Sequence, residues 1–524
     1  MEKNKSRKLT MVAIIAFAIL IVGASYAYLT AQTLTGKTTD INVTSYTTDV
    51  FTFATGDAIN LEADQTTFGM TGGSISGSTY ASALLTANNK TNKAVERYYL
   101  YLNIENNTFT YSVQDGKPEL IMTITDKDGN EVKNIEGLTY TEVTDRTNKK
   151  ITGYDITTKS GLVTIFNNRE ITAEPKAEDK WNITITFVNY EADQNANTGK
   201  VLSAKLMIQK KAFPIHEICN DNTLSCYIAK LYTGTQGENN LYHHNGTLEN
   251  GIDDNSYRYA GASDKVNNYV CFGSDESPCP TDNLYRIIGV IDGKVKLIKY
   301  DYATSDLLGT DGDYKAGYRY GDAGYKGSNF ENIAAYNWNN ATQSNTWSES
   351  NLNKINLNTN FLTNIGKSWA DKITETAWKV GGNTKENIKE VIPSVAYQNE
   401  TLNPMSNTTD GKTEYNAKIG LMYVSEYGFA ASPSAWTTTL NEYNKVKNKY
   451  WMYMGLYEWT ITRTAGTRTA SISDSAFAVA GLDGYVYYST VISNFNGIRP
   501  TFSLYSSITY ESGQGTATDP IRIN

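Results

Sequence analysis

The cysteines are the residues of this chain with the clearest potential for chemistry. There are four of them, Cys219, Cys226, Cys271 and Cys279. An even number of cysteines in a chain that leaves the cytoplasm indicates disulfides, and four cysteines allow three pairings. We favour the local pairs Cys219–Cys226 and Cys271–Cys279, which close short loops. Zinc is the alternative because His216-x-x-Cys219 has ligand-like spacing, but the remaining spacings fit no zinc pattern.

The three histidines are His216, His243 and His244. An adjacent His-His pair in a loop rich in Gly and Asn can bind a metal, although such a pair is more often a solvated turn, which is what we expect here. Any Ser-His-Asp or Cys-His mechanism would have to use one of these three side chains. None stands beside a recognisable nucleophile motif, and Gly-x-Ser-x-Gly does not occur. We therefore predict no catalytic residue.

Two groups of acidic residues could have a catalytic or a metal-binding role. Glu426 and Glu458 could form the acid/base pair of a glycosidase, but nothing in the sequence brings them together. Asp311-Gly312-Asp313 resembles a fragment of a calcium loop, yet it lacks the alternating oxygen ligands and the distal Glu of an EF-hand. We expect a polar turn there. No cofactor is expected, and calcium is kept as the alternative.

The N-terminal segment, residues 1–30, predicts export. Its positive charges, Lys3, Lys5, Arg7 and Lys8, come directly before the apolar stretch 11–22. The stretch is intermediate in length between a signal peptide and a membrane anchor, and the small-x-small segment Ser25-Tyr26-Ala27 offers a cleavage site. The sequence leaves open whether the N-terminal segment is cleaved or is retained as a membrane anchor. The rest of the chain is expected at the cell surface, on the extracellular side of the membrane, or secreted if the signal is cleaved.

Composition narrows the classes of partner. The chain has 524 residues, a net charge of −8 and only 19% charged residues, but 38 Tyr and 40 Gly. An acidic chain without a basic patch makes nucleic acid an unsuitable partner. Its length indicates two or three domains. A surface rich in Asn, Thr, Ser and Tyr is typical of exported β proteins and of surfaces that face carbohydrate.

Residues 31–212 alternate between apolar and polar with a period of two. The clearest examples are 99–104, 120–124, 181–187 and 202–208. This pattern predicts antiparallel strands with one buried face, and polar turns separate them. Because helical periodicity is nearly absent, we predict a β-sandwich that acts as a stalk.

The second half of the chain has a different pattern. A connector, 213–283, contains the cysteines, the histidines and the motif Asp254-Asn255-Ser256-Tyr257-Arg258-Tyr259-Ala260-Gly261. Residues 284–299, with Asp292-Gly293 at their centre, give the clearest hairpin signal. Apolar spacing over 352–369 predicts short helices. Short strands are expected at 421–424, 452–456, 476–480, 485–488 and 501–504. Seven of the eight Trp lie here, which predicts a separate domain, 284–524.

Two family resemblances add to this. The signal ending Gly23-Ala24-Ser25-Tyr26-Ala27-Tyr28, and the segment 181–208 with Asp193-Gln194-Asn195-Ala196-Asn197-Thr198-Gly199-Lys200 between its strands, resemble TasA/camelysin-type biofilm matrix proteins of Gram-positive bacteria. This resemblance covers about a third of the chain. It implies an extracellular jelly-roll-like sandwich that could self-assemble, and it implies no catalytic residue.

The second resemblance covers nearly half the chain. The segments 283–290, 419–425, Glu458-Trp459-Thr460 and Gly497-Ile498-Arg499-Pro500 are similar to uncharacterised surface-protein domains of Gram-positive (Firmicutes) gut bacteria, and the order of elements resembles a C-type-lectin-type fold. The Fibrobacter paralogous domain and formylglycine-generating enzymes are more distantly similar. Those enzymes need active-site cysteines, and no cysteine follows Cys279. The fold class expected is thus mainly β: an N-terminal transmembrane or signal helix, an antiparallel β-sandwich and an α+β C-type-lectin-like domain.

The second resemblance implies where a ligand would bind. In C-type-lectin-type folds the ligand face is usually built by the late loops and strands, here 463–473 and 480–496. The candidate contacts are Arg463, Tyr485, Tyr487, Tyr488, Asn494 and Phe495. Exposed Tyr and Asn suit recognition because Tyr buries much area at small entropic cost. We expect Arg499 to be structural, tying the last strand to a carboxylate or carbonyl, and Trp451 and Trp459 to lie in the core.

Three functions follow as hypotheses. The first is an adhesin-like surface protein whose distal domain binds a glycan or protein ligand. The second is a structural protein whose sandwich polymerises into matrix fibres. The third, with the least support, is an enzyme acting on polysaccharide. The partners expected are an extracellular ligand, the membrane through the N-terminal segment, and further copies of the chain if it self-assembles.

Overall fold

The structure is a computed structural model of the chain. It describes residues 49–64, 72–88, 93–135, 137–219, 221–316, 334–381, 388–405, 412–464, 475–481, 483–492 and 496–524. The chain divides into two compact units after Phe213, next to the boundary predicted at 212. The predicted signal or anchor lies outside the described residues. In the part that is described, no helix combines the length and the apolar character needed to cross a bilayer.

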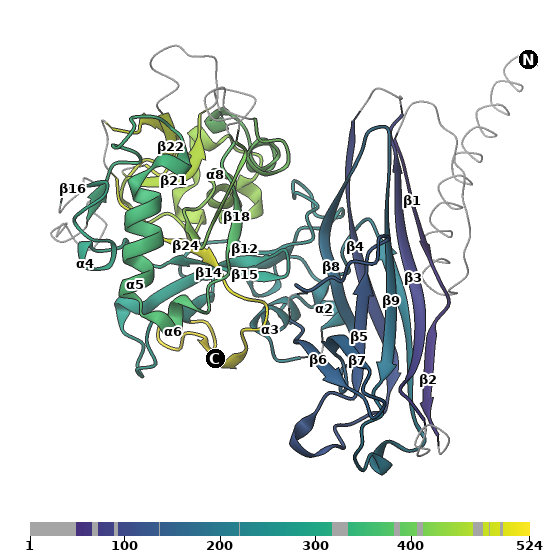
Figure 1. Ribbon diagram of the computed structural model, residues 1–524. Coiled ribbons are helices and arrows are strands. Elements are labelled where there is room, and N and C mark those ends of the chain that lie inside the picture. The colour runs from purple at the N-terminus through teal and green to yellow at the C-terminus, as the bar shows by residue number, and fades with distance from the viewer. Residues whose placement is uncertain are drawn as a thin grey trace, which may run out of the picture. The chain divides into compact units, whose positions relative to one another are not determined.

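The N-terminal unit is built of two antiparallel sheets (Figure 1). The six-stranded sheet has the order β1-β3-β9-β5-β7-β6, and the four-stranded sheet has the order β2-β10-β4-β8. The strands are β1 (Val50–Thr55), β2 (Ile59–Ala63), β3 (Ile75–Thr86), β4 (Ala94–Asn107), β5 (Leu120–Thr125), β6 (Tyr140–Thr144), β7 (Lys150–Asp155), β8 (Gly161–Ala173), β9 (Lys176–Phe187) and β10 (Lys200–Gln209). The predicted strands therefore fall within β4, β5, β9 and β10, and their alternation is confirmed.

One apolar core joins the two sheets into a sandwich. Leu85 and Ile183 of the six-stranded sheet and Leu102 and Leu206 of the four-stranded sheet belong to the same buried cluster. The strands supply this core with every second residue, as the alternating burial of β2 illustrates. Because successive side chains of a strand point to opposite faces, this pattern fixes which face of each sheet is buried.

A buried carboxylate fastens the loop that follows β9. Glu119 is fully buried and accepts hydrogen bonds from the backbone N–H of Val113 (3.0 Å), Gln194 Nε2 (2.6 Å) and Asn197 Nδ2 (2.8 Å). The polar segment 193–200, on which the first resemblance rests in part, is thus held by hydrogen bonds to a single carboxylate. Asn197 also donates to the backbone carbonyl of Thr110, which ties the loop to the chain before β5.

The C-terminal unit surrounds a seven-stranded sheet of order β11-β12-β14-β15-β24-β20, with β13 paired to β14. Its strands are β11 (Leu241–His243), β12 (Tyr257–Tyr259), β13 (Tyr269–Cys271), β14 (Leu284–Ile291), β15 (Lys294–Lys299), β16 (Tyr314–Ala316), β17 (Ala335–Tyr336), β18 (Thr376–Lys379), β19 (Glu414–Ala417), β20 (Ile419–Gly420), β21 (Glu458–Arg463), β22 (Ser475–Val479), β23 (Val486–Thr490), β24 (Thr501–Ser503), β25 (Tyr510–Ser512) and β26 (Arg522–Ile523). Its α-helices are α2 (Ile215–Ile218), α3 (Leu224–Lys230), α4 (Ser305–Leu308), α5 (Leu362–Asn364), α6 (Lys367–Ala370), α7 (Pro393–Tyr397) and α8 (Val424–Phe429).

The predicted connector is not separate from this unit. Residues 214–283 belong to the same compact unit as the rest, because β12 and β13 both pair with β14 and β11 pairs with β12. This pairing could not be predicted from the sequence, because β11, β12 and β13 are each only three residues long. Both predicted disulfides, Cys219–Cys226 and Cys271–Cys279, are confirmed, which excludes zinc at Cys219. Disulfides indicate an oxidising environment.

The expected hairpin is confirmed as β14–β15. Asp292 and Gly293 form its turn with φ values of +49° and +76°, and two positive φ angles are what a tight hairpin of this type requires. The predicted helical stretch 352–369 is also helical, as a π-helical segment (Leu352–Phe361) followed by α5 and α6. Of the late strands, β22, β23 and β24 agree with the prediction.

Two of the predicted late strands are wrong. Residues 421–424 leave the sheet after β20 and turn into α8, where the Glu426 side chain accepts the backbone N–H of Tyr423 (2.9 Å) and so caps the helix. Residues 452–456 form a turn, with Gly455 at a φ of +91°. Short apolar runs do not distinguish a strand from a buried helix start, which explains the first error.

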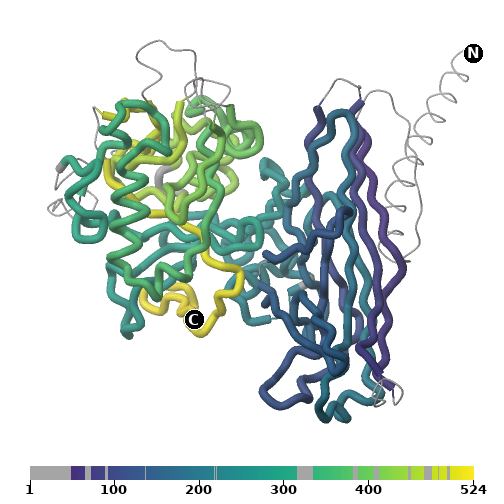
Figure 2. The backbone as a smooth tube through the Cα atoms, viewed as in Figure 1, coloured from purple at the N-terminus to yellow at the C-terminus, as the bar shows by residue number. Residues whose placement is uncertain are grey.

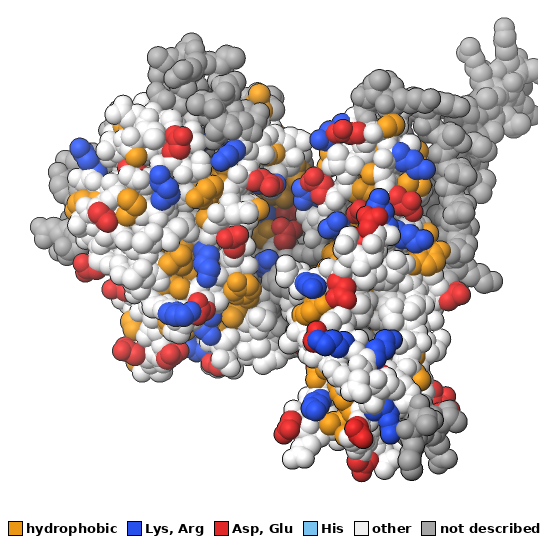
Figure 3. Space-filling model, in the orientation of Figure 1, with side chains coloured by type: hydrophobic (Ala, Val, Ile, Leu, Met, Phe, Trp, Pro, Cys, Tyr) orange, Lys and Arg blue, Asp and Glu red, His pale blue; other side chains and the backbone are white. Residues whose placement is uncertain are grey.

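The start and end of the C-terminal unit are paired. Thr223 bridges Thr509, and Val270 bridges Ile521. In Figure 2 the yellow C-terminal segment accordingly returns to the teal beginning of the unit. On the face drawn in Figure 3, blue and red side chains are scattered among a mostly white surface. Uncharged polar groups and backbone therefore make up much of this face, as the composition indicates.

Candidate functional site

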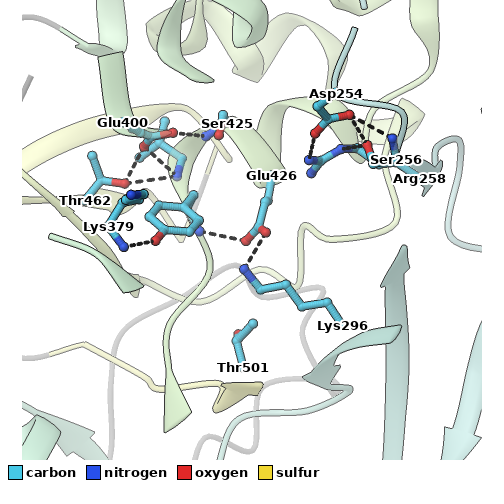
Figure 4. Close-up of polar contacts among 12 residues, drawn as sticks. Asp254, Ser256, Arg258, Lys296, Lys379, Glu400, Ser425, Glu426, Thr462 and Thr501 are labelled. Carbon is cyan, nitrogen blue, oxygen red and sulfur yellow. Dashed lines mark hydrogen bonds and ion pairs between the residues drawn. The ribbon is translucent and has the colours of Figure 1, made fainter. Parts of the chain in front are cut away.

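A buried carboxyl group, Glu400, lies at the start of α8. Its oxygens accept hydrogen bonds from the backbone N–H groups of Val424 and Ser425, both at 3.0 Å, and from the hydroxyl of Thr462 on β21 (Figure 4). Glu400 belongs to the helical turn Gln398–Leu402, which directly continues α7. Three segments distant in sequence therefore meet at this side chain.

A second carboxylate on α8 forms an ion pair with a lysine of the central sheet. Glu426 accepts a hydrogen bond from Lys296 Nζ on β15 at 2.5 Å, and both side chains are buried, with exposed fractions of 4% and 8%. The ammonium nitrogen lies 4.6 Å from the ring centre of Trp378 and 4.8 Å from that of Tyr423. These rings replace water around the charge, and aromatic faces attract cations.

A third group of charges comes from the motif 254–261. Arg258 on β12 donates from Nη2 to Asp254 and from Nε to the hydroxyl of Ser256, both at 2.8 Å (Figure 4). The guanidinium also lies 5.7 Å from the ring centre of Tyr397 on α7. The motif that the sequence singled out is therefore a buried ion pair next to the Lys296–Glu426 pair.

Burial sets the protonation of these groups. It raises the pKa of Glu400 to about 7, against hydrogen bonds from Ser425 and Thr462 that favour the charged form. Burial lowers the pKa of Lys296, and Glu426 opposes that change. Burial acts to raise the pKa of Asp254, but Arg258, His244 and Ser256 together outweigh it and the pKa is lowered. Lys296 thus pairs with Glu426 and Arg258 with Asp254. Among the described residues Glu400 has no such cation, and burial favours its neutral form.

Glu426 and Glu458 do not form the acid/base pair considered from the sequence. Glu458 is bound by Arg499, which donates from Nε and Nη2 at 2.8 Å each, and Arg499 also donates to the carbonyl of Met452. The expected structural role of Arg499 is confirmed. Trp451 and Trp459 are fully buried, as predicted for core residues.

The candidate ligand contacts divide into three groups. Arg463 is only 1% exposed and donates to the carbonyls of Asn345 (3.3 Å) and Lys412 (3.2 Å), so in this structure it is a buried structural residue rather than a surface contact. The sequence misplaced it because a strand-end arginine is ordinarily exposed. Asn494 and Phe495 lie outside the described residues.

The three candidate tyrosines lie at or next to β23. Tyr487 contacts Tyr485 and Tyr457 with ring centres 6.1 and 5.9 Å apart, both edge to face. Tyr488 faces the opposite side of the strand, is 45% exposed and lies under Lys389, whose Nζ is 4.7 Å from the ring centre. Tyr457, Tyr485 and Tyr487 are half-buried. We call these four residues the tyrosine cluster: Tyr487 joins Tyr457 and Tyr485 on one side of β23, and Tyr488 lies on the other side. Of the six predicted contacts, the structure brings Tyr485 and Tyr487 into contact.

His243 and His244 are core residues, which corrects the expected solvated turn. His243 is 2% exposed, stacks on Tyr257 with ring centres 4.4 Å apart and bonds to Asn255 at 2.6 Å. His244 is fully buried against Phe429 and Trp436. Burial lowers the pKa of both side chains, to about 3 for His244. Both histidines are buried because they pack against aromatic rings, and the sequence alone does not reveal these contacts.

The calcium alternative at Asp311–Asp313 has a local explanation. Asp313 is 1% exposed and accepts the backbone N–H groups of Asn340 (2.8 Å) and Leu352 (2.7 Å). Asp311 accepts a hydrogen bond from Asn360 Nδ2 at 2.7 Å. Both carboxylates thus tie loops together. Within the described ranges, no three His, Cys, Asp or Glu side chains gather as a metal site would require.

Sequence analysis missed Lys296 and Glu400. The signal for Lys296 is a charged residue inside the apolar run Val295-Lys296-Leu297-Ile298, where a strand covered on both faces leaves no solvent for it. Glu400 carries no comparable signal, because its burial depends on where α7 packs against α8.

The sequence matches no known protein-family model, and no curated protein is similar to it at a significant level.

Proposed function

We propose that this chain is an exported cell-surface binding protein whose C-terminal unit recognises an extracellular glycan through the tyrosine cluster of β23. The observation that carries the proposal is the position of four tyrosines at β23: Tyr457, Tyr485 and Tyr487 meet on one side, and on the other side Tyr488 is 45% exposed beside the cation of Lys389. Tyrosine combines an apolar ring with a polar hydroxyl, so it can cover the apolar face of a sugar and bond to its hydroxyls.

The rigidity of the surroundings supports a recognition surface. β23 pairs with β22 along five residues, from Ser475↔Thr490 to Val479↔Val486. Val486 and Ser489, which flank Tyr487 and Tyr488 on the strand, are buried. Side chains on a fixed strand lose little entropy when they bind a ligand, which favours affinity.

For the fold of this unit we propose a C-type-lectin-like arrangement. Its support is the paired start and end of the unit and the order of elements: the β14–β15 hairpin, then helices, then the late strands β21–β23, with β24 returning to pair with β15. Export and surface attachment rest on the N-terminal charge pattern, and both disulfides are consistent with them. The sandwich would then be the stalk.

The test is a glycan and host-protein array probed with the purified protein, in calcium and in chelator. Wild type is expected to bind a defined set of glycans. Tyr487→Ala and Tyr488→Ala should each weaken binding about tenfold or more, the usual cost of truncating a central aromatic contact. Tyr505→Ala is the matched control, because Tyr505 is 39% exposed in the same unit but lies after β24.

Each outcome of the array decides between the hypotheses. Binding to host proteins but to no glycan would support the adhesin hypothesis and show that the ligand is a protein. Binding lost equally in Tyr505→Ala would contradict the tyrosine cluster as the site. A blank array in both buffers would overturn the binding function and favour the fibre-forming alternative, which negative-stain microscopy of the same sample tests directly.

A further inference from the structure

The Lys296–Glu426 pair is unusually well buried for a lysine–carboxylate pair. Its two side chains are 8% and 4% exposed, whereas the fractions are 25% and 43% in Lys205–Glu105 and 21% and 48% in Lys379–Glu414. The pair joins β15 to α8 across 130 residues of sequence. A lysine and a glutamate are thus held in contact, out of water, between distant parts of the fold.

We propose that Lys296 and Glu426 become joined by an amide bond between Nζ and Cδ once the unit has folded. The evidence is the contact of 2.5 Å between Nζ and Oε1 in a dry, aromatic environment. Cδ lies one bond beyond this oxygen, so the nucleophile already lies beside the carbon it attacks. Holding two reactants in this way replaces much of the entropy of a bimolecular encounter.

The reaction balances without any further reagent. A proton passes from the ammonium to Oε1 along the existing hydrogen bond, which leaves a neutral amine and a carboxylic acid. The lone pair of Nζ attacks Cδ, the second amine proton is transferred to the departing hydroxyl, and one water leaves. The nitrogen–carbon bond forms, the carbon–oxygen bond breaks, and nothing is oxidised or reduced.

Burial favours the reactive form of the lysine. Removing a charge from water costs free energy, so a dry site favours the neutral amine over the ammonium. The lowered pKa of Lys296 has burial as its first cause. The rings of Trp378 and Tyr423 keep water from the product, which protects the amide against hydrolysis.

Two further buried ion pairs of the unit are internal controls. Arg499–Glu458 and Arg258–Asp254 are as dry, with side-chain exposures of 1% and 2%, and 3% and 13%. Their guanidinium groups stay charged at any ordinary pH and do not condense with carboxylates. Of these three buried pairs, chemistry therefore selects Lys296–Glu426 for cross-linking.

The test is mass spectrometry of the reduced, alkylated and denatured full chain. Wild type is expected to be lighter than its sequence by one water and to yield a branched tryptic peptide that joins Lys296 to Glu426. Lys296→Arg should show the full mass, and Lys379→Arg should keep the loss of water. A wild-type mass without this loss, and no branched peptide, would overturn the proposal whether or not the variants fold, because an ion pair does not survive denaturation.

Discussion

The two units place their charges differently. In the sandwich, ion pairs lie at the surface: Arg97–Glu170 has exposed fractions of 44% and 50%, and Lys150–Glu142 has 71% and 53%. In the C-terminal unit, Arg499–Glu458 is 1% and 2% exposed. Exposed pairs contribute little to stability, whereas a buried charge that loses its partner is costly. We infer that apolar alternation specifies the sandwich, whereas the C-terminal unit depends also on charges that must be matched inside it.

Breaking one pair in each unit should give the largest difference. Arg499→Met leaves Glu458 buried without its cation, so we expect the unfolding free energy of the C-terminal unit to fall by about 3–5 kcal/mol. Arg97→Met in the sandwich should cost only about 0–1 kcal/mol. Urea unfolding followed by Trp fluorescence reports on the C-terminal unit, which holds seven of the eight Trp, and far-UV circular dichroism follows the sandwich. Equal losses in the two variants would refute the comparison.

The disulfides should stabilise one unit only. Both Cys219–Cys226 and Cys271–Cys279 lie in the C-terminal unit and close short loops, with sequence separations of 7 and 8. Replacing the pair Cys271 and Cys279 by serine should lower the unfolding free energy of that unit by about 2–3 kcal/mol. The thermal transition of the sandwich should not move. A shift of both transitions would mean that the units do not unfold independently.

The sandwich also has a buried carboxyl group, Glu119, but its hydrogen-bond donors are neutral groups. Glu119→Ala removes the acceptor for Val113, Gln194 and Asn197 and leaves their N–H groups buried without it. We expect a loss of about 1–3 kcal/mol in the sandwich. Glu178→Ala, at an exposed position of β9, is the matched control and should be near neutral. If Glu119→Ala were equally neutral, the carboxylate would not be what holds the loop after β9.

The two units should respond to pH with opposite signs. Burial by itself raises the pKa of Asp145 in the sandwich. Hydrogen bonds from Thr147, Lys149 and Ser74 outweigh burial and lower this pKa to about 2. Its contribution is present above its ordinary pKa of 3.8 and is lost as the pH falls towards 2. Burial raises the pKa of Glu400 from 4.5 to about 7, so its contribution is present below pH 4.5 and is lost as the pH rises to 7.

Urea titrations of each unit between pH 2 and pH 8 measure these contributions. Asp145→Asn should flatten the acid limb of the sandwich, and Glu400→Gln should flatten the decline of the C-terminal unit between pH 4.5 and pH 7. If the Glu400→Gln variant had the same pH profile as wild type, the raised pKa of Glu400 would not contribute to the pH dependence of stability.

The same contrast explains what the sequence could predict. The strands β4, β5, β9 and β10 were predictable because one buried face per sheet imposes a period of two. The hairpin β14–β15 was predictable because few residues tolerate its turn. The boundary near residue 213 followed from the end of the alternating apolar and polar pattern. These signals are all local in sequence.

The rest depends on contacts between distant segments. The burial of Arg463 and His244, the acceptance of α8 N–H groups by Glu400 and the pairing of Lys296 with Glu426 each join residues far apart in the chain. Propensity and spacing do not encode such contacts, so Arg463 was placed at the surface and His244 in a solvated turn. Of the predicted site, Tyr487 and Tyr488 could be placed because the short apolar run that holds them forms a strand, β23.

The central claim is that ligand recognition belongs to the C-terminal unit and to its tyrosine cluster. The most direct test compares glycan binding by Tyr488→Ala with binding by Tyr111→Ala, because Tyr488 is 45% exposed in the C-terminal unit and Tyr111 is 43% exposed in the sandwich. The account predicts about a tenfold weaker affinity for Tyr488→Ala and wild-type affinity for Tyr111→Ala. The reverse result, or equal affinities in both variants, would contradict it.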